Sequence, residues 1–286
     1  MRRRALRQAL DGRLGGGDAS RALSGIDIVG DIGIIKVPDS LIERRHEMGE
    51  RLLERLPSLK AVYRQTSPVN VVERVRGIEW LAGERRTATT YVESGCSFKV
   101  DVSSVYFSPR LSFERRRVAG ICRTGETVVN MFAGVGTFSI VMARLSGVKK
   151  VYSIDCNPAA YELMVENVEM NGMGGRVVPL MGDAKDFVRS LRGTADRVLM
   201  PLPELAINYM EHAVRYLSGR GWLHVYLHTE GRTGEDAMAD AERQTAAGAA
   251  AIFNIMEMQS RVVRSIGSRT FQVVVDAYGE GLIRDE

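Results

Sequence analysis

The sequence predicts an α/β fold in which a parallel sheet carries a ligand at the carboxyl ends of its strands. Two β-branched residues, Val128 and Val129, lead into the glycine turn of residues 133–136, and a short helix follows. A second apolar run then ends at an acid, Asp155. This order of strand, glycine-rich loop, helix, strand and acid is typical of the first half of a Rossmann-like nucleotide-binding domain.

The glycine loop also indicates which kind of ligand this domain would hold. Gly134 and Gly136 lack a Cβ, so the backbone can approach a ligand closely, and Asp155 can accept from both ribose hydroxyls. The loop lacks the third glycine of the dinucleotide fingerprint, which argues against a pyrophosphate at the helix N-terminus. An adenosine without phosphates fits better, and S-adenosylmethionine is the common ligand of this kind.

From residue 126 onward, strands and helices alternate, which predicts a parallel sheet covered on both faces. The strands are expected at 126–132, 149–155, 176–181, 195–200 and 221–228. The helices between them are expected at 137–146, 158–171, 184–191 and 203–217. An Ala-rich helix at 235–251 leads to two closing strands, about 255–265 and 270–277, expected as an antiparallel hairpin.

A smaller α/β domain is predicted at 26–107, ahead of this sheet. Gly30 and Asp31 interrupt an alternating apolar pattern, which predicts a hairpin of short strands. Asp39 and Ser40 are expected to cap a helix that Pro57 ends. Further strands are expected as far as about Phe107.

Two other segments complete the predicted organisation. Residues 1–25 are rich in Arg and Gly and predict a short helix followed by a basic tether. Residues 108–125 predict a helix that connects the small domain to the domain of 126–286. Residues 1–125 contain 23 Lys and Arg against 15 Asp and Glu, whereas the rest of the chain contains 16 against 20. A basic first part beside a near-neutral cofactor domain predicts a polyanionic substrate.

The composition excludes several other classes of protein. No apolar run approaches the 18 residues of a membrane span, and no apolar stretch follows the basic start as it would in a signal peptide. Cys96, Cys122 and Cys156 have neither the spacing of zinc ligands nor a disulfide pattern. We therefore expect a cytoplasmic enzyme without a metal and without a membrane partner.

Several segments resemble the archaeal and eukaryotic family of tRNA guanosine-37 N1-methyltransferases, over roughly residues 25–278. The most specific is SPRLSFER at 108–115, because generic methyltransferases do not carry it; NMFAGVGTFSI and DRVLMPLP also match. The resemblance implies a class I S-adenosylmethionine-dependent methyltransferase that acts as a monomer on the anticodon arm of tRNA. Family members often carry an additional N-terminal domain, and we expect a form that lacks it, because about 25 residues precede the matching region.

The resemblance also implies a catalytic set. Guanine N1 carries a proton, so its methylation needs a general base and a cation that stabilises the charge on O6. Glu114 matches the family's base and Arg74 its cation, while Arg110 would hold a phosphate or orient Glu114. The alternative is that Glu114 only pairs with Arg110 or Arg117 on a helix face.

The roles in cofactor binding carry over in the same way. The resemblance implies that Tyr106 and Phe132 flank the cofactor and that Gly134 and Gly136 lie beside its methionine part. It assigns the ribose hydroxyls to Asp155. Asp183 would accept from the adenine amino group, or cap the helix that begins at Ala184, and the two roles can coexist.

The chain departs from the family pattern at two positions. Asn130 stands where an acid is usual, and it can form hydrogen bonds but cannot counter a sulfonium charge. Pro201 stands where the family usually has the Asn of an Asn-Leu-Pro sequence, so a side-chain amide that would touch the target base is missing. Pro201, Leu202 and Pro203 leave backbone carbonyls and a rigid wall for a flipped base.

Three alternatives to guanosine-37 methylation remain. One is a related wyosine-pathway enzyme that transfers the aminocarboxypropyl group of the same cofactor. Another is methylation of a tricyclic wyosine precursor, for which the changed Pro201 is an argument. The last is a tRNA-binding relative with weakened catalysis, against which the joint presence of Glu114, Arg74, Asp155 and Asp183 argues.

Overall fold

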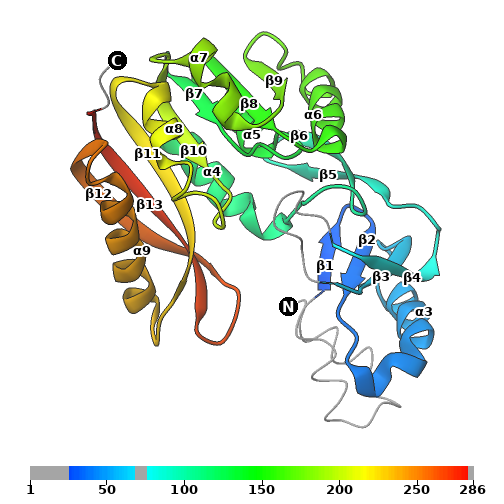
Figure 1. Cartoon of the computed structure of the whole chain (residues 1–286). Coiled ribbons are helices and arrows are strands. Elements are labelled where there is room, and N and C mark those ends of the chain that lie inside the picture. The colour runs from blue at the N-terminus through cyan, green and yellow to red at the C-terminus, as the bar shows by residue number, and fades with distance from the viewer. Residues whose placement is uncertain (1–25, 68–75, 283–286) are drawn as a thin grey trace. The chain divides into compact units, whose positions relative to one another are not determined.

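The structure is a computed structural model that describes residues 26–67 and 76–282. Two compact units divide the chain, Met1–Arg110 and Leu111–Glu286, and Figure 1 shows the elements of each. The tether expected at 1–25 lies outside the described residues. Arg74, the expected partner of the guanine oxygen, also lies outside them.

The first unit contains a four-stranded sheet in the order β1-β2-β3-β4. Its strands are β1 (Ile26–Val29), β2 (Ile32–Ile35), β3 (Ala61–Gln65) and β4 (Ile78–Gly83). The hairpin expected at Gly30 joins β1 to β2, and Gly30 has a φ of 55° that a glycine adopts without strain. β3 lies parallel to β2, so the segment between them crosses over as a helical connection.

This connection begins differently from the prediction. Asp39–Arg44 form a 3-10 helix, and the α-helix α3 covers Arg45–Arg55. The residue before the 3-10 helix is Pro38, and no side chain caps it, so Asp39 and Ser40 lie inside the helical segment and do not cap it. The helical segment buries Leu41, Met48 and Leu52 against the sheet, which forms the core of the unit.

A separate two-stranded sheet completes the first unit, with β5 (Ala88–Glu93) and β6 (Cys96–Asp101). Ser94 and Gly95 connect them with φ of 52° and 70°, the left-handed pair that tight two-residue hairpins use. β6 ends at Asp101 and does not continue to Phe107, because the Asp101 carboxylate accepts from the backbone N–H and the hydroxyl of Ser103.

The second unit contains a seven-stranded sheet in the order β12-β13-β11-β10-β7-β8-β9. β10 runs parallel to β7 and β11, β8 runs parallel to β7 and β9, and β13 is antiparallel to β11 and β12. The predicted closing hairpin is thus confirmed. The strands are β7 (Thr127–Asn130), β8 (Lys150–Asp155), β9 (Val177–Met181), β10 (Ala195–Met200), β11 (Leu217–Glu230), β12 (Phe253–Ser265) and β13 (Thr270–Gly281).

Helices cover both faces of this sheet, as predicted. They are α4 (Ser112–Ile121), α5 (Thr137–Leu145), α6 (Pro158–Met170), α7 (Val188–Leu191), α8 (Met210–Tyr216) and α9 (Gly234–Ala249). Leu223, Val225 and Leu227 of β11 join a core with buried residues of α7, α8 and α9. The side chains that alternate with them on β11 point to the other face, where Tyr226 contacts Phe138 of α5 and Glu114 of α4.

The helix expected at 203–217 is shorter than predicted. Residues 203–209 form turns, α8 begins at Met210, and β11 begins at Leu217. Pro201 and Pro203 have no backbone N–H to donate, and the Leu202 carbonyl accepts from Leu205 and Ala206 at 3.1 and 3.0 Å. Residues 203–209 thus form a compact series of turns at the end of β10, ahead of the regular helix.

Two further findings concern the described part of the chain. None of the helices in residues 26–67 and 76–282 is long and apolar enough to cross a membrane. The same residues contain no group of three or more His, Cys, Asp and Glu that could hold a metal ion.

Candidate active site

The loop that follows β7 lies where the sheet changes direction. The chain passes from β7 to β8 and β9 on one side, and then returns to β10 and β11 on the other. In open α/β sheets, ligands bind outside the carboxyl ends of the strands at such a switch point. Asn130, Asp155, Met181 and Met200 end four of the five parallel strands at this edge, and the first of these strands ends two residues before its predicted end at 132.

The two loop glycines have different local surroundings. Gly134 and Gly136 both have positive φ, 55° and 86°, and Gly136 is the residue before α5. A Cβ built on Gly136 would lie 3.0 Å from Cγ of Met164 and 3.3 Å from Cδ1 of Ile140. Those atoms belong to the interior of the domain. Gly136 therefore serves the turn and its packing against α6, and its expected place beside the methionine part of the cofactor remains a prediction.

Asp155 holds the loop in place. Its Oδ2 accepts from the Gly134 N–H at 2.6 Å and its Oδ1 from the Asn157 N–H at 3.0 Å. Burial raises the pKa of Asp155, and these two backbone donors act in the opposite direction. A carboxylate has about four acceptor positions, so within residues 26–67 and 76–282 each oxygen keeps one for a further donor. This arrangement fits a carboxylate that receives two ribose hydroxyls.

Asn130 is fully buried beneath the loop. Its Nδ2 donates to the Ser139 hydroxyl at 3.1 Å, and Ser153 donates to the same hydroxyl at 2.7 Å. Oδ1 of Asn130 has no hydrogen-bond partner among the described residues. A buried acceptor without a partner is costly, so a donor in this position would stabilise the site.

Asp183 has more partners than expected. It caps the 3-10 helix Ala184–Phe187 by accepting from the Lys185 N–H at 3.0 Å, which confirms the capping alternative. The Tyr209 hydroxyl donates to its two oxygens at 2.9 and 2.8 Å, and the Lys185 ammonium lies 3.0 Å away. Burial alone would raise the pKa of Asp183, yet the bonds to Lys185 and Tyr209 hold it below its usual value. An adenine amino group would have to displace one of these partners.

Tyr209 also belongs to this site, although the sequence did not predict it there. Its ring lies edge-on to Phe132, with the centroids 5.2 Å apart, and burial together with Asp183 raises the pKa of its hydroxyl to about 12. It stays a neutral donor at physiological pH. Tyr209 follows the loop of Pro201, Leu202 and Pro203 in the turns where a regular helix was predicted, so no periodic pattern indicated that it returns to Asp183.

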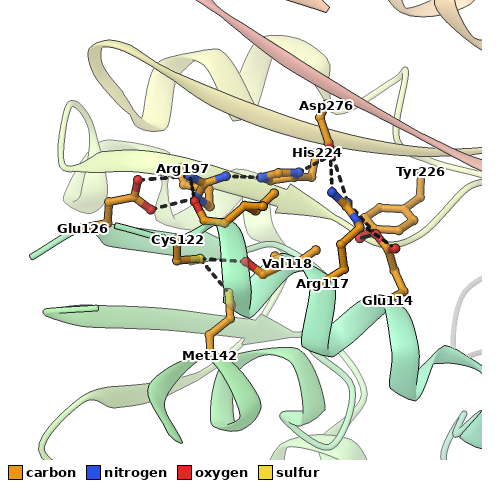
Figure 2. A network of polar contacts seen from close by, with 11 residues as sticks. Glu114, Arg117, Val118, Cys122, Glu126, Met142, Arg197, His224, Tyr226 and Asp276 are labelled. Carbon is orange, nitrogen blue, oxygen red and sulfur yellow. Dashed lines mark hydrogen bonds and ion pairs between the residues drawn. The ribbon is translucent and has the colours of Figure 1, made fainter. Parts of the chain in front are cut away.

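Glu114 is buried, with 2% of its surface exposed, near the start of α4. Arg117 donates to its two oxygens at 2.9 and 2.7 Å, and Tyr226 donates to Oε1 at 2.8 Å (Figure 2). The ion pair with Arg117 that the sequence analysis held open is thus present. It does not exclude proton transfer, because the three donors leave one acceptor position on Oε2 within the described residues.

The expected residues of the first unit have other surroundings. Arg110 forms an ion pair with Asp27 at 2.8 Å, so Arg117 and Tyr226 take the place expected for Arg110 in orienting Glu114. Tyr106 follows β6 in the same unit as Arg110. The role of Tyr106 beside the cofactor and the role of Arg110 in holding a phosphate remain predictions.

Comparison with known proteins identifies the family. Residues 89–250 match the TRM5/TYW2 methyltransferase domain. Residues 6–87 match the TYW2 N-terminal domain, so the expectation that the chain lacks the family's N-terminal domain is not supported.

Two relatives with different activities have similar sequence identity to this chain. The chain is 38% identical over 252 residues to the tRNA 4-demethylwyosine(37)-methyltransferase of Saccharolobus solfataricus, a match that covers 88% of this chain and 92% of the relative. It is 35% identical over 250 residues to a tRNA (guanine(37)-N(1))-methyltransferase of Pyrococcus abyssi, covering 87% of this chain and 73% of that protein.

A solved structure supports the same assignment. The complex of aTrm5 with tRNALeu superposes with a TM-score of 0.77 at 33% identity, covering 91% of this chain and 72% of that one. The fold is that of class I S-adenosylmethionine-dependent methyltransferases, and the chain belongs to the TRM5/TYW2 family of tRNA-modifying enzymes.

Proposed function

We propose that this protein methylates the tricyclic wyosine precursor 4-demethylwyosine at position 37 of tRNA, with S-adenosylmethionine as the methyl donor. The observation that carries the proposal is the match to the 4-demethylwyosine methyltransferase of S. solfataricus, which extends over 92% of that protein. The guanosine-37 enzyme of P. abyssi is matched over 73% of its length. The anticodon arm is the part of tRNA that we expect this protein to bind, and we expect it to bind as a monomer.

Pro201 supports a tricyclic base over guanosine. An Asn at this position, usual in guanosine-37 enzymes, would offer an amide to the edge of guanine. Pro201 offers no donor, and the turn that follows it uses the Leu202 carbonyl internally. A site without that amide loses selectivity for guanine, since a missing hydrogen bond to a polar edge changes discrimination strongly.

The residues around the loop fit the adenosine part of the cofactor. Asp155 keeps one acceptor position on each oxygen, which suits two adjacent ribose hydroxyls. The ring of Phe132, packed edge-on against Tyr209, offers an apolar surface to the adenine. Asp183 would receive the adenine amino group in exchange for the exposed Lys185 ammonium.

Glu114 is the residue that we assign as the general base, which takes up the proton released from the target base. Bound S-adenosylmethionine supplies an electrophilic methyl group on a sulfonium sulfur. The ring position that receives the methyl loses a hydrogen as a proton, so a base must take it up. Glu114 has one acceptor position left on Oε2, where it can accept this proton. We assign Arg74 to stabilise the negative charge that develops on the nucleobase.

Methyl-transfer assays on defined tRNAs test this proposal. The substrates are tRNAs with 4-demethylwyosine, guanosine or adenosine at position 37, and the cofactor is labelled either in its methyl group or in its carboxyl carbon. We expect methyl label on the 4-demethylwyosine tRNA and no transfer of the carboxyl label.

Each other result selects one of the alternatives. Methyl label on the guanosine tRNA alone would establish guanosine-37 methylation. Transfer of the carboxyl label would establish aminocarboxypropyl transfer. Cofactor binding without transfer to any of the three tRNAs would indicate a relative with weakened catalysis.

A further inference from the structure

A chain of six charged and polar side chains runs through the interior of the second unit (Figure 2). Arg197 contacts Glu126 at 2.8 and 3.0 Å and His224 at 2.6 Å. His224 contacts Asp276 at 2.5 Å, and Asp276 contacts Arg117 at 2.6 and 3.2 Å. Arg117 in turn holds both oxygens of Glu114. The chain thus begins at Glu126 and ends at the assigned base.

The sheet fixes the middle of this chain. His224 of β11 and Asp276 of β13 are direct cross-strand partners in the antiparallel register. Arg197 comes from the neighbouring strand β10, and Arg117 and Glu114 come from α4 on the face that Tyr226 also lines. The orientation of Arg117 therefore depends on a strand that lies 159 residues away in sequence.

The donors determine the protonation of His224. A guanidinium can only donate, so His224 Nε2 accepts from Arg197 and its Nδ1–H donates to Asp276. His224 is fully buried, and burial lowers its pKa, which agrees with a neutral ring. Asp276 is ionised, because His224 and Arg117 lower its pKa more than burial raises it.

Arg117 is held from both sides by this arrangement. Its Nη1 and Nη2 donate to Asp276, and its Nε and Nη2 donate to Glu114. The guanidinium is planar, so a carboxylate on one edge fixes the direction of the donors on the other edge. Without Asp276, Nη1 of Arg117 would lose its carboxylate and the guanidinium could rotate away from Glu114.

We propose that Asp276, fixed by the neutral His224, is a positioning residue for the methyl transfer. Asp276 orients Arg117, and Arg117 holds Glu114 so that the last acceptor position of its Oε2 can receive the substrate proton. This inference rests on the proposed role of Glu114 as the base. Removal of one partner of a buried ion pair also destabilises the fold, so a positioning role has to be measured as a rate of the folded enzyme.

Single-turnover methyl transfer with a double-mutant cycle tests the proposal. Asp276→Asn keeps the shape of the side chain, but its amide turns a donor toward Arg117 or His224. We expect the single-turnover rate at saturation to fall about 100-fold, the scale of a misplacement near 1 Å, while the dissociation constants for cofactor and tRNA stay unchanged. Asp276→Glu keeps the charge and should retain more activity than Asp276→Asn.

The background of Glu114→Gln separates positioning from general damage. If Asp276 acts through Glu114, then Asp276→Asn should lower the rate of the Glu114→Gln enzyme by no more than about twofold. An unchanged 100-fold loss in that background would overturn the proposal. Gln272→Ala is the matched control. Gln272 is a buried residue on the same strand as Asp276, β13, and the substitution removes the hydrogen bond that Arg264 of β12 donates to it, so the rate should stay unchanged.

A second readout does not depend on the substrate. Nitrogen-15 NMR of the folded wild-type protein should show His224 neutral with its proton on Nδ1; a proton on Nε2, or a charged ring at neutral pH, would contradict the proposed chain. The cycle is run on whichever tRNA the wild type methylates. Failure on 4-demethylwyosine tRNA therefore refutes the proposed substrate, whereas the cycle and the NMR result decide the role of Asp276.

Discussion

Gly136→Ala is the substitution that best separates a structural role of the glycine loop from a role in ligand approach. Two costs can be worked out from the structure. The φ of 86° is a left-handed conformation, which costs an alanine about 1 kcal/mol. The new Cβ would also lie 3.0 Å from Cγ of Met164, and such overpacking costs about 1 kcal/mol or more. We expect the free energy of unfolding to fall by about 2 kcal/mol in total.

Gly172→Ala provides the matched control. Gly172 has a φ of 66°, and no described atom outside its chain neighbours lies within 4 Å of a Cβ built there. It should therefore show the conformational cost alone, about 1 kcal/mol. Combining Gly136→Ala with Met164→Ala should remove the overpacking component, because the longer Met side chain is then absent.

Chemical denaturation and cofactor titration of the same variants complete the test. The midpoint of unfolding should fall further for Gly136→Ala than for Gly172→Ala, with no change in the denaturant slope. The dissociation constant of S-adenosylmethionine should change little in the folded variant. The packing argument would be refuted if Gly136→Ala had the same unfolding free energy as Gly172→Ala and bound the cofactor more than about tenfold more weakly. That result would show that Gly136 is needed for the close approach of the ligand.

Four further predictions concern the cofactor, acid stability, base selection and RNA binding. Asp155→Ala should weaken cofactor binding by about 10- to 100-fold, because two hydrogen bonds to a charged group are lost. Calorimetry measures this affinity, and an unchanged dissociation constant would show that Asp155 does not bind the ribose. The pKa of Asp276 is lower in the folded protein than its unfolded value of 3.8, so ionised Asp276 stabilises the fold above that pH and this stability is lost as the pH falls toward the folded pKa. The difference in unfolding free energy between wild type and Asp276→Asn should therefore narrow as the pH falls below about 4. Pro201→Asn should raise methyl transfer to guanosine-37 relative to 4-demethylwyosine, and an unchanged ratio would show that this position does not select the base. RNA affinity should fall steeply with salt because residues 1–125 carry 23 Lys and Arg against 15 Asp and Glu, and a flat dependence would exclude phosphate contacts by these residues.

The strands and their carboxyl edge were predictable because the signals are local. The apolar run before Asp155 and the short runs before Asp183 and Pro201 each specify a buried strand and the point where it ends. Parallel strands place those ends at one edge, so the cofactor loop followed from the sequence without knowledge of the packing.

The rest depends on contacts between distant residues or on competing local effects. His224 and Asp276 lie in ordinary strand patterns, and their pairing follows only from the register of β11 and β13. Tyr209 reaches Asp183 from the turns that precede α8, where the sequence predicted a regular helix. At Asp39, a capping residue type lies inside a 3-10 segment, because the preceding Pro38 sets the start of that segment.

The position of β13 bears on when during synthesis the enzyme becomes competent. β13 (Thr270–Gly281) lies between β11 and β12, and it is the last strand of the sheet to leave the ribosome. Until it inserts, β11 has an open edge, and Arg117 and His224 lack the carboxylate that orders them. A nascent chain can thus contain the whole glycine loop long before Arg117 has both of its carboxylate partners. The core also lacks Val273, Val275 and Ala277 until then, so the unit completes its packing only with its last strand.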